Sequence, residues 1–227
     1  MVQRTDLNAL FKVLGYQFND IDNLRLALTH RSAKGQHNER LEYLGDAVLG
    51  MVVAEALFRR FPEQPEGKLT RMRSSLVKGV TLAELGNEFG LGQFLLLGPG
   101  ELKSGGFRRS SILADAVEAI IGAIFLEAGL EICKERILTW LKSRIERLDP
   151  DEHPKDHKTR LQEYLQGRKL PLPEYEVVDI RGQSHDQTFA IECRVSGLKK
   201  PIKSVGSSRR KAEQQAAAEA LRELTHD

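Results

Sequence analysis

The sequence predicts two domains, an all-α domain followed by a small α+β domain. Apolar residues recur every three or four positions from the N-terminus to about residue 148, which is the period of an amphipathic helix. Residues 149–156 carry two prolines and many charges but no aliphatic side chain, as in a solvated linker. Beyond them, apolar and polar residues alternate at 175–180 and 188–195, the period of a strand. We therefore expect domains over 1–148 and 157–226.

Amphipathic segments account for the whole first domain. The longest begins near Leu41 and ends near Phe61, where Pro62 cannot continue a helix. No segment before residue 150 has a convincing strand pattern. The apolar positions predict helices near residues 7–14, 21–28, 41–61, 68–78, 81–89, 112–126 and 130–148.

The second domain has the predicted order α-β-β-β-α. A helix over Thr159–Gln166 precedes two strands that are joined by a turn at Arg181–Asp186, and Pro201–Val205 forms a third strand. An Ala-rich helix with serine at its start occupies Ser207–Leu224. This order fits two helices on one face of an antiparallel sheet.

Composition narrows the class of protein without identifying a partner. With 34 basic and 32 acidic residues, the net charge is +2, so the distribution of charge is more informative than its total. The two cysteines, Cys133 and Cys193, lie far apart and indicate neither a disulfide framework nor a zinc site. The N-terminus does not resemble a signal peptide, and no apolar run reaches the ~18 residues of a membrane helix. We expect a cytoplasmic protein without a membrane partner.

Two apolar helices each carry a pair of carboxylates. Glu42 and Asp46, four positions apart, are the charged residues of Leu41–Ala54, and Asp115 and Glu118 are three apart in a similar segment. Either spacing places both acids on one side of a helix. Each pair alone could simply reach solvent or cap a neighbouring helix.

The two pairs together indicate a metal site. Four carboxylates at short range repel one another, and a hard divalent cation with oxygen ligands removes that repulsion. Mg²⁺ is the expected ion, with Mn²⁺ able to substitute, and no Cys or His accompanies the acids as zinc would require. Two such ions would suit attack of water on a phosphodiester.

Other residues near these segments allow two interpretations. Glu39 and Glu66 could be solvated or helix-start acids, or could support catalysis or contact substrate. His30 is expected to be a packed or capping histidine rather than a metal ligand. The Gly-rich stretch Gly98–Ser111 lacks the pattern of a nucleotide-binding P-loop, and we expect a mobile loop beside the acids that could contact phosphates.

Basic residues are segregated in the second domain. Arg194–Lys211 contains seven basic residues and no acidic ones. Such a cluster can be merely a solvated face, but three of its cations occupy the first turn of the last helix, where the helix dipole disfavours them. A phosphate would compensate. Since no paired aromatics are available to stack bases, a duplex recognised by its shape is the expected ligand. The contacts expected are the first helix (Thr159, Gln162, Glu163), the turn at His185, and Arg209, Arg210 and Lys211.

Several motifs resemble those of the ribonuclease III family. NERLEYLGD at Asn38–Asp46 looks like the family signature, and ALTHRS, SGGFRRSSILADAVEA and KTRLQEYLQGR…SSRRKAEQQAAAEAL extend the similarity over nearly the whole chain. The resemblance implies an all-α endonuclease domain of the ribonuclease III fold, a short linker and a double-stranded RNA-binding domain.

The resemblance also implies roles for particular residues. Asp46 and Glu118 would be the indispensable catalytic acids, and Glu39 and Glu66 secondary acids associated with substrate or the dimer cleft. Glu213 departs from the broader RNA-binding pattern, which often has a third basic residue there. The metal ligands would be Glu42, Asp46, Asp115 and Glu118, and the RNA contacts Thr159, Gln162, Glu163, His185, Ser208, Arg209, Arg210 and Lys211.

The activity implied is Mg²⁺-dependent cleavage of double-stranded RNA by a homodimer without a small-molecule cofactor. Products would carry 5′-phosphate and 3′-hydroxyl ends with short 3′ overhangs. Substrates would include precursors of ribosomal RNA, and also some messenger, antisense and transfer RNAs. Two alternatives remain at this point. A double-stranded RNA binder that does not cut is disfavoured by the intact acids, and a phosphohydrolase for small nucleotides is disfavoured by the basic C-terminal domain.

Overall fold

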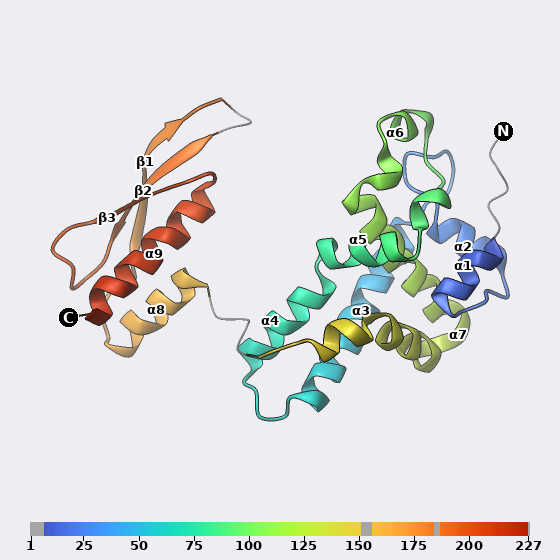
Figure 1. Ribbon diagram of the computed structural model, residues 1–227, viewed down its shortest axis with the longest axis horizontal. Coiled ribbons are helices and arrows are strands. Elements are labelled where there is room, and N and C mark those ends of the chain that lie inside the picture. Colours follow the sequence, from blue (N-terminus) through green and yellow to red (C-terminus); the bar gives the residue numbers. More distant parts are fainter. Residues whose placement is uncertain (1–6, 151–155, 184–186, 227) are drawn as a thin grey trace. The chain divides into compact units, whose positions relative to one another are not determined.

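The chain folds into two compact units, Met1–His153 and Pro154–Asp227 (Figure 1). The computed structural model describes residues 7–150, 156–183 and 187–226. Residues 151–155, most of the predicted linker, lie outside the described residues. The exact boundaries expected at residues 148 and 157 therefore remain predictions.

The first unit is helical, as the sequence predicts. Within its described residues, β-type pairing is limited to an isolated bridge between Thr29 and Leu96. The elements are α1 (Leu7–Leu14), α2 (Ile21–Ala27), α3 (Glu39–Arg60), α4 (Glu66–Val77), α5 (Gly79–Glu88), η1 (Leu91–Gln93), α6 (Pro99–Lys103), η2 (Gly106–Arg108) and α7 (Ser110–Glu146), where η marks a 3-10 helix.

The long helix α7 forms the centre of this unit and packs against α3 and α5 (Figure 1). Its residues 112–124 are nearly all buried, which explains their almost continuous apolar character. The sequence predicts two helices here, and the structure agrees: α7 consists of two helical segments that meet at a kink at Gly129, where φ is 77° and ψ is −179°. Glycine tolerates this backbone conformation because it has no Cβ.

The second unit has the predicted α-β-β-β-α order. Its elements are α8 (His157–Gly167), β1 (Glu174–Arg181), β2 (Thr188–Arg194), β3 (Ile202–Gly206) and α9 (Arg209–His226). The strands form an antiparallel sheet in the order β1-β2-β3, with an irregularity between Val177 and Asp179. Leu161 and Leu165 of α8 and the alanines of α9 pack with Cys193 and Ile202 of the sheet, so both helices share one core with the strands.

Both cysteine thiols are free and buried. None of the helices in the described parts of the chain is long and apolar enough to cross a membrane.

Candidate functional site

Helices α3 and α7 cross where each carries a glycine. A Cβ added to Gly45 would stand 1.8 Å from the carbonyl oxygen of Glu118, and one added to Gly122 would stand 2.3 Å from the carbonyl oxygen of Leu41. The two backbones therefore touch, and only glycine fits at either position. This close crossing brings the acids of α3 beside those of α7.

Three carboxylates meet at the crossing. Glu42, Asp115 and Glu118 each place one oxygen within 4.8 Å of the others, and all three side chains are half-buried. Asp46 is exposed, yet its charge acts on Glu118. The structure thus brings Glu42 together with Asp115 and Glu118, whereas the fourth predicted acid, Asp46, is not one of the three grouped carboxylates.

Burial and mutual repulsion make these acids hard to ionise. Burial, followed by the charges of Asp46, Glu42 and Asp115, raises the pKa of Glu118 to about 8. Burial and then Asp115 raise the pKa of Glu42, and burial raises the pKa of Asp115. A group of acids with raised pKa values takes up either a proton or a cation, and the cation restores the ionised form. The donor set consists of carboxylate oxygens alone, which suits a hard divalent ion.

A cavity of about 800 Å³ opens beside the cluster. Glu42 and Asp115 share its lining with His30, Arg31 and Arg109, so acids that can hold a cation lie close to groups that attract an anion. Arg109 also pairs with Glu101, with 2.8 Å between its Nη1 and Oε1 of the carboxylate. Arg31 was not singled out from the sequence, although it follows His30 in the ALTHRS motif.

The two secondary acids occupy different places. Glu39 lines the same cavity as Glu42, and its Oε1 lies 3.3 Å from Nη1 of Arg31. Glu66 lines another cavity, between α3 and α4, where its Oε1 accepts a 2.6 Å hydrogen bond from Thr70 Oγ1. The structure therefore places Glu39, but not Glu66, in the lining of the acidic cavity.

The Gly-rich stretch Gly98–Ser111 is more regular than predicted. It contains α6 and η2 instead of an open loop. A Cβ at Gly98 would lie 2.1 Å from the carbonyl oxygen of Ser32, and one at Gly106 would lie 2.6 Å from Glu101. These glycines serve close packing, a requirement that composition alone does not distinguish from mobility.

The start of α9 presents the predicted cations. Arg209, Arg210 and Lys211 are exposed, and Ser208 Oγ accepts a hydrogen bond from the backbone N–H of Lys211 at 3.2 Å. Such a bond is typical of a helix N-terminus. The three side chains and the helix end together form a surface that attracts anions.

Glu213 has a structural reason to be acidic. It is 8% exposed, and its two carboxylate oxygens accept hydrogen bonds from Arg209 Nε at 2.8 Å and Lys158 Nζ at 2.6 Å. The carboxylate thus ties α8 to the first turn of α9 and holds two cations in place. Lys158 was not predicted as a functional residue. Its position directly before Thr159, the first residue of the predicted contact helix, was the available signal.

The predicted contacts on α8 lie near one another. Gln162 and Glu163 are exposed, and the Thr159 hydroxyl donates a hydrogen bond to Asp156 Oδ2 at 3.0 Å. His185 lies outside the described residues, so the structure says nothing about the expected contact at the β1–β2 turn.

Known proteins match both units. Residues 20–145 match the model of the family described as ribonuclease-III-like, and residues 157–224 match that of the double-stranded RNA binding motif. Ribonuclease 3 of Vibrio atlanticus is 58% identical over 97% of this chain and 98% of its own length, and that of Aliivibrio fischeri is 61% identical over 97% and 99%.

Solved structures match the first unit. The nuclease domain of ribonuclease III from Campylobacter jejuni is 44% identical, with a TM-score of 0.61, and covers 64% of this chain and 99% of that one. A second structure of that domain is 44% identical, with a TM-score of 0.60 and coverage of 62% and 99%. Its description concerns structural flexibility in a region involved in dimer formation.

Proposed function

The chain belongs to the ribonuclease III family, and from this premise we propose that it is a Mg²⁺-dependent enzyme whose products carry 5′-phosphate and 3′-hydroxyl ends. It is an endoribonuclease with a double-stranded RNA-binding domain. The observation that supports the metal dependence best is the cluster of Glu42, Asp115 and Glu118. Two of its members, Glu42 and Asp115, line a cavity that also holds arginines. Membership of this family sets aside both alternatives, a binder that does not cut and a phosphohydrolase for small nucleotides.

We assign distinct roles to the acids. Glu42, Asp46, Asp115 and Glu118 would hold the ion, with Asp46 and Glu118 indispensable, and Glu39 and Glu66 would act as secondary acids. When bound, Mg²⁺ supplies activation of water and stabilisation of the leaving oxygen. Arg31 and Arg109 line the same cavity as two of these acids and would draw the phosphate backbone towards them. Mn²⁺ should substitute for Mg²⁺ because it prefers similar oxygen ligands.

The activity is tested with an end-labelled RNA duplex. We expect cleavage in Mg²⁺ or Mn²⁺, none in excess chelator, and product ends that a ligase requiring a 5′-phosphate can join. A duplex that stays uncut at saturating protein and Mg²⁺ would refute the proposal, and cleavage that survives exhaustive chelation would refute its metal dependence. Single-stranded RNA of the same sequence is the control substrate.

The second unit would bind the duplex through its helices and the β1–β2 turn. The residues proposed are Thr159, Gln162, Glu163, His185, Ser208, Arg209, Arg210 and Lys211, to which the structure adds Lys158 as a neighbour of Arg209 through Glu213. Each exposed cation that displaces counterions from the RNA makes binding dependent on salt.

Replacing Arg209 and Arg210 by alanine is expected to weaken duplex binding similarly for all sequences. The slope of log affinity against log salt concentration should decrease in magnitude by up to about two. The control is Arg168→Ala with Arg222→Ala, which removes the same charge from exposed positions at the C-terminal cap of α8 and near the C-terminal end of α9. Affinities are measured by filter binding across a salt series. Losses that depend on base sequence, or equal losses in the control, would contradict a phosphate role.

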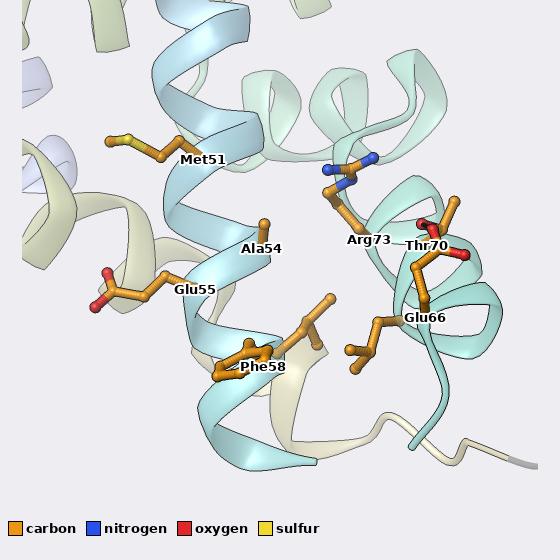
Figure 2. A pocket seen from close by; sticks show the side chains of 9 residues that line it. Met51, Ala54, Glu55, Phe58, Glu66, Thr70 and Arg73 are labelled. Atoms are coloured by element: carbon orange, nitrogen blue, oxygen red, sulfur yellow. Dashed lines mark hydrogen bonds between the residues drawn. The ribbon is translucent and has the colours of Figure 1, made fainter. Parts of the chain in front are cut away.

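We propose that α3 also forms a homodimer interface. Its exposed face carries large apolar side chains: Tyr43 is 82% exposed, Met51 50% and Phe58 70%. Spacings of eight and seven positions put the three on one side of the helix. Figure 2 shows the hollow at the end of this face, where Ala54 and Phe58 of α3 lie opposite Thr70 and Arg73 of α4. An exposed apolar stripe beside a cavity of about 510 Å³ suits self-association about a two-fold axis.

The Phe58→Glu variant is expected to weaken dimerisation by about 30-fold or more. The substitution removes the apolar contacts of an aromatic ring and places a charge in the interface. Sedimentation should give the native protein twice the mass of the 25.5 kDa chain and shift the variant towards one chain mass. Val80 is 62% exposed on α5, so Val80→Glu is the matched control. A native protein that sediments as a monomer at high concentration would contradict the interface.

The cellular role proposed is processing of ribosomal RNA precursors and of some messenger, antisense and transfer RNAs in the cytoplasm. The two free, buried thiols are compatible with a reducing compartment.

A further inference from the structure

The segment His30–Ser32 borders the acidic cavity without belonging to the hydrophobic core. His30 is half-buried and lines the cavity together with Glu42 and Asp115. The position of its imidazole ring is therefore not set by the hydrophobic core, and hydrogen bonds must fix it.

The backbone of His30 is held on both sides. Its N–H donates to the carbonyl of Leu96 at 3.0 Å, and its carbonyl accepts from the N–H of Ala33 at 2.9 Å. Gly98 completes the support, because a Cβ there would stand 2.1 Å from the carbonyl oxygen of Ser32. The chain at residues 96–98 can therefore lie directly against the 30–32 segment.

The imidazole ring is also fixed, through its Nδ1 atom. The backbone N–H of Ser32 donates to Nδ1 at 3.2 Å, and Ser32 Oγ lies 2.8 Å from the same nitrogen. Because the N–H of Gly98 donates to Ser32 Oγ at 2.9 Å, the hydroxyl hydrogen is available for the ring. With Nδ1 accepting both bonds, the ring proton is assigned to Nε2.

We propose that His30 is a substrate-contacting residue whose Nε2–H donates a hydrogen bond to a non-bridging oxygen of the phosphate in the acidic cavity, with Ser32 and Gly98 as its positioning residues. The inference rests on the proposed function, since it concerns the same site. A donor held in place before the substrate arrives stabilises developing charge without the cost of reorganisation.

A phosphate oxygen suits this position better than a ribose hydroxyl. Arg31 and Arg109 line the same cavity, so His30 is one of several groups there that attract negative charge. A carboxylate cluster loaded with divalent ions would add further positive charge, and the imidazole would give the contact its direction through its fixed N–H.

The decisive variants are His30→Gln and His30→Asn. The amide nitrogen of glutamine reaches the place of Nε2, whereas that of asparagine corresponds to Nδ1. We expect His30→Asn to slow single-turnover cleavage at saturating protein by about 30-fold or more and His30→Gln by less than about fivefold. Duplex affinity, measured for each variant in a Glu118→Gln background so that RNA stays intact, should change by less than about twofold. Asparagine cleaving within about threefold of the native rate, or glutamine as slow as asparagine, would overturn the proposal.

Two further measurements separate the contact from a merely structural role. Ser32→Ala should slow cleavage by about fivefold on its own but add nothing to His30→Asn, because both act through one ring; additive losses would contradict positioning by Ser32.

A duplex with 2′-deoxyribose beside the scissile phosphate should show the same loss of cleavage rate for His30→Asn as all-ribose RNA. Disappearance of the loss would identify the 2′-hydroxyl as the group contacted and overturn the phosphate contact. If the native protein cuts no duplex, the proposed function fails; if it cuts and these variants match it, the role of His30 alone fails.

Discussion

The Glu118→Gln variant is expected to cleave duplex RNA at least about 1000-fold more slowly than the native protein while binding RNA with similar affinity. The amide keeps the size of the side chain but replaces a negatively charged oxygen ligand of the group Glu42, Asp115 and Glu118 by a neutral, weaker one. A factor of 1000 corresponds to about 4 kcal/mol of transition-state stabilisation, in the range of several kcal/mol that metal-ion catalysis supplies. Single-turnover cleavage and filter binding measure the two quantities separately.

The matched control is Glu131→Gln, which removes an exposed carboxylate from the same helix α7. Its cleavage rate should stay within about twofold of the native rate. A Glu118→Gln protein that retained a tenth of native activity would show that this carboxylate is not an essential ligand.

The same substitution is expected to stabilise the protein when metal is absent. Burial, then Asp46 and the other acids, raise the pKa of Glu118 from 4.5 to about 8. Between these two pKa values, the folded state binds a proton that the unfolded chain has released. The contribution of this group to the unfolding free energy is therefore fully present below the unfolded pKa and is lost as pH rises through about 8. Glutamine does not ionise and avoids this loss.

In chelator, the melting temperature of Glu118→Gln should therefore exceed that of the native protein by a margin that grows as pH rises from the unfolded pKa of 4.5 to about 8 and then stays constant. Mg²⁺ should raise the melting temperature of the native protein more than that of the variant, because the ion binds the ionised cluster. Scanning calorimetry at several pH values tests both expectations, and a margin independent of pH would contradict the raised pKa.

The Gly45→Ala variant is expected to lose about 2–4 kcal/mol of unfolding free energy and most of its activity. Its Cβ would stand 1.8 Å from the carbonyl oxygen of Glu118, so α3 and α7 must separate or slide. Overpacking of a close contact destabilises by this amount. Any separation also moves Glu42 away from Asp115 and Glu118, so cleavage should fall even at temperatures where the variant stays folded.

Gly50→Ala provides a control of opposite sign on the same helix. A Cβ at Gly50 meets nothing within 4 Å, and alanine in a helix interior is favoured over glycine by about 0.5–1 kcal/mol. Urea unfolding should therefore rank Gly50→Ala at or above the native protein and Gly45→Ala well below it. Equal stability of the two variants would show that the crossing at Gly45 is not a constraint.

The order of secondary-structure elements could be read from the chain because local periodicity encodes it. The 3.6-residue period of α3 and the alternation in β2 each depend on which face is buried, and that information is contained in a few neighbouring residues. The break at Gly129 was predicted, but the short helices α6 and η2 were not. Glycine marks an open loop, a kink and a close contact alike, and only the surrounding backbone distinguishes them.

The acidic residues of the site were also identifiable in the sequence, because charges in an apolar helix are costly and demand an explanation. By itself, the sequence determined which residue types lie on which helix face: Glu42 with Asp46, Asp115 with Glu118, and the cations at the start of α9. Only the tertiary structure decided that Gly45 and Gly122 bring those faces into contact, that Glu213 joins Lys158 to Arg209, and that His30 borders the acids. The physical reason is that a helix face is set by residues three or four positions apart, whereas distances between segments depend on how the whole core packs.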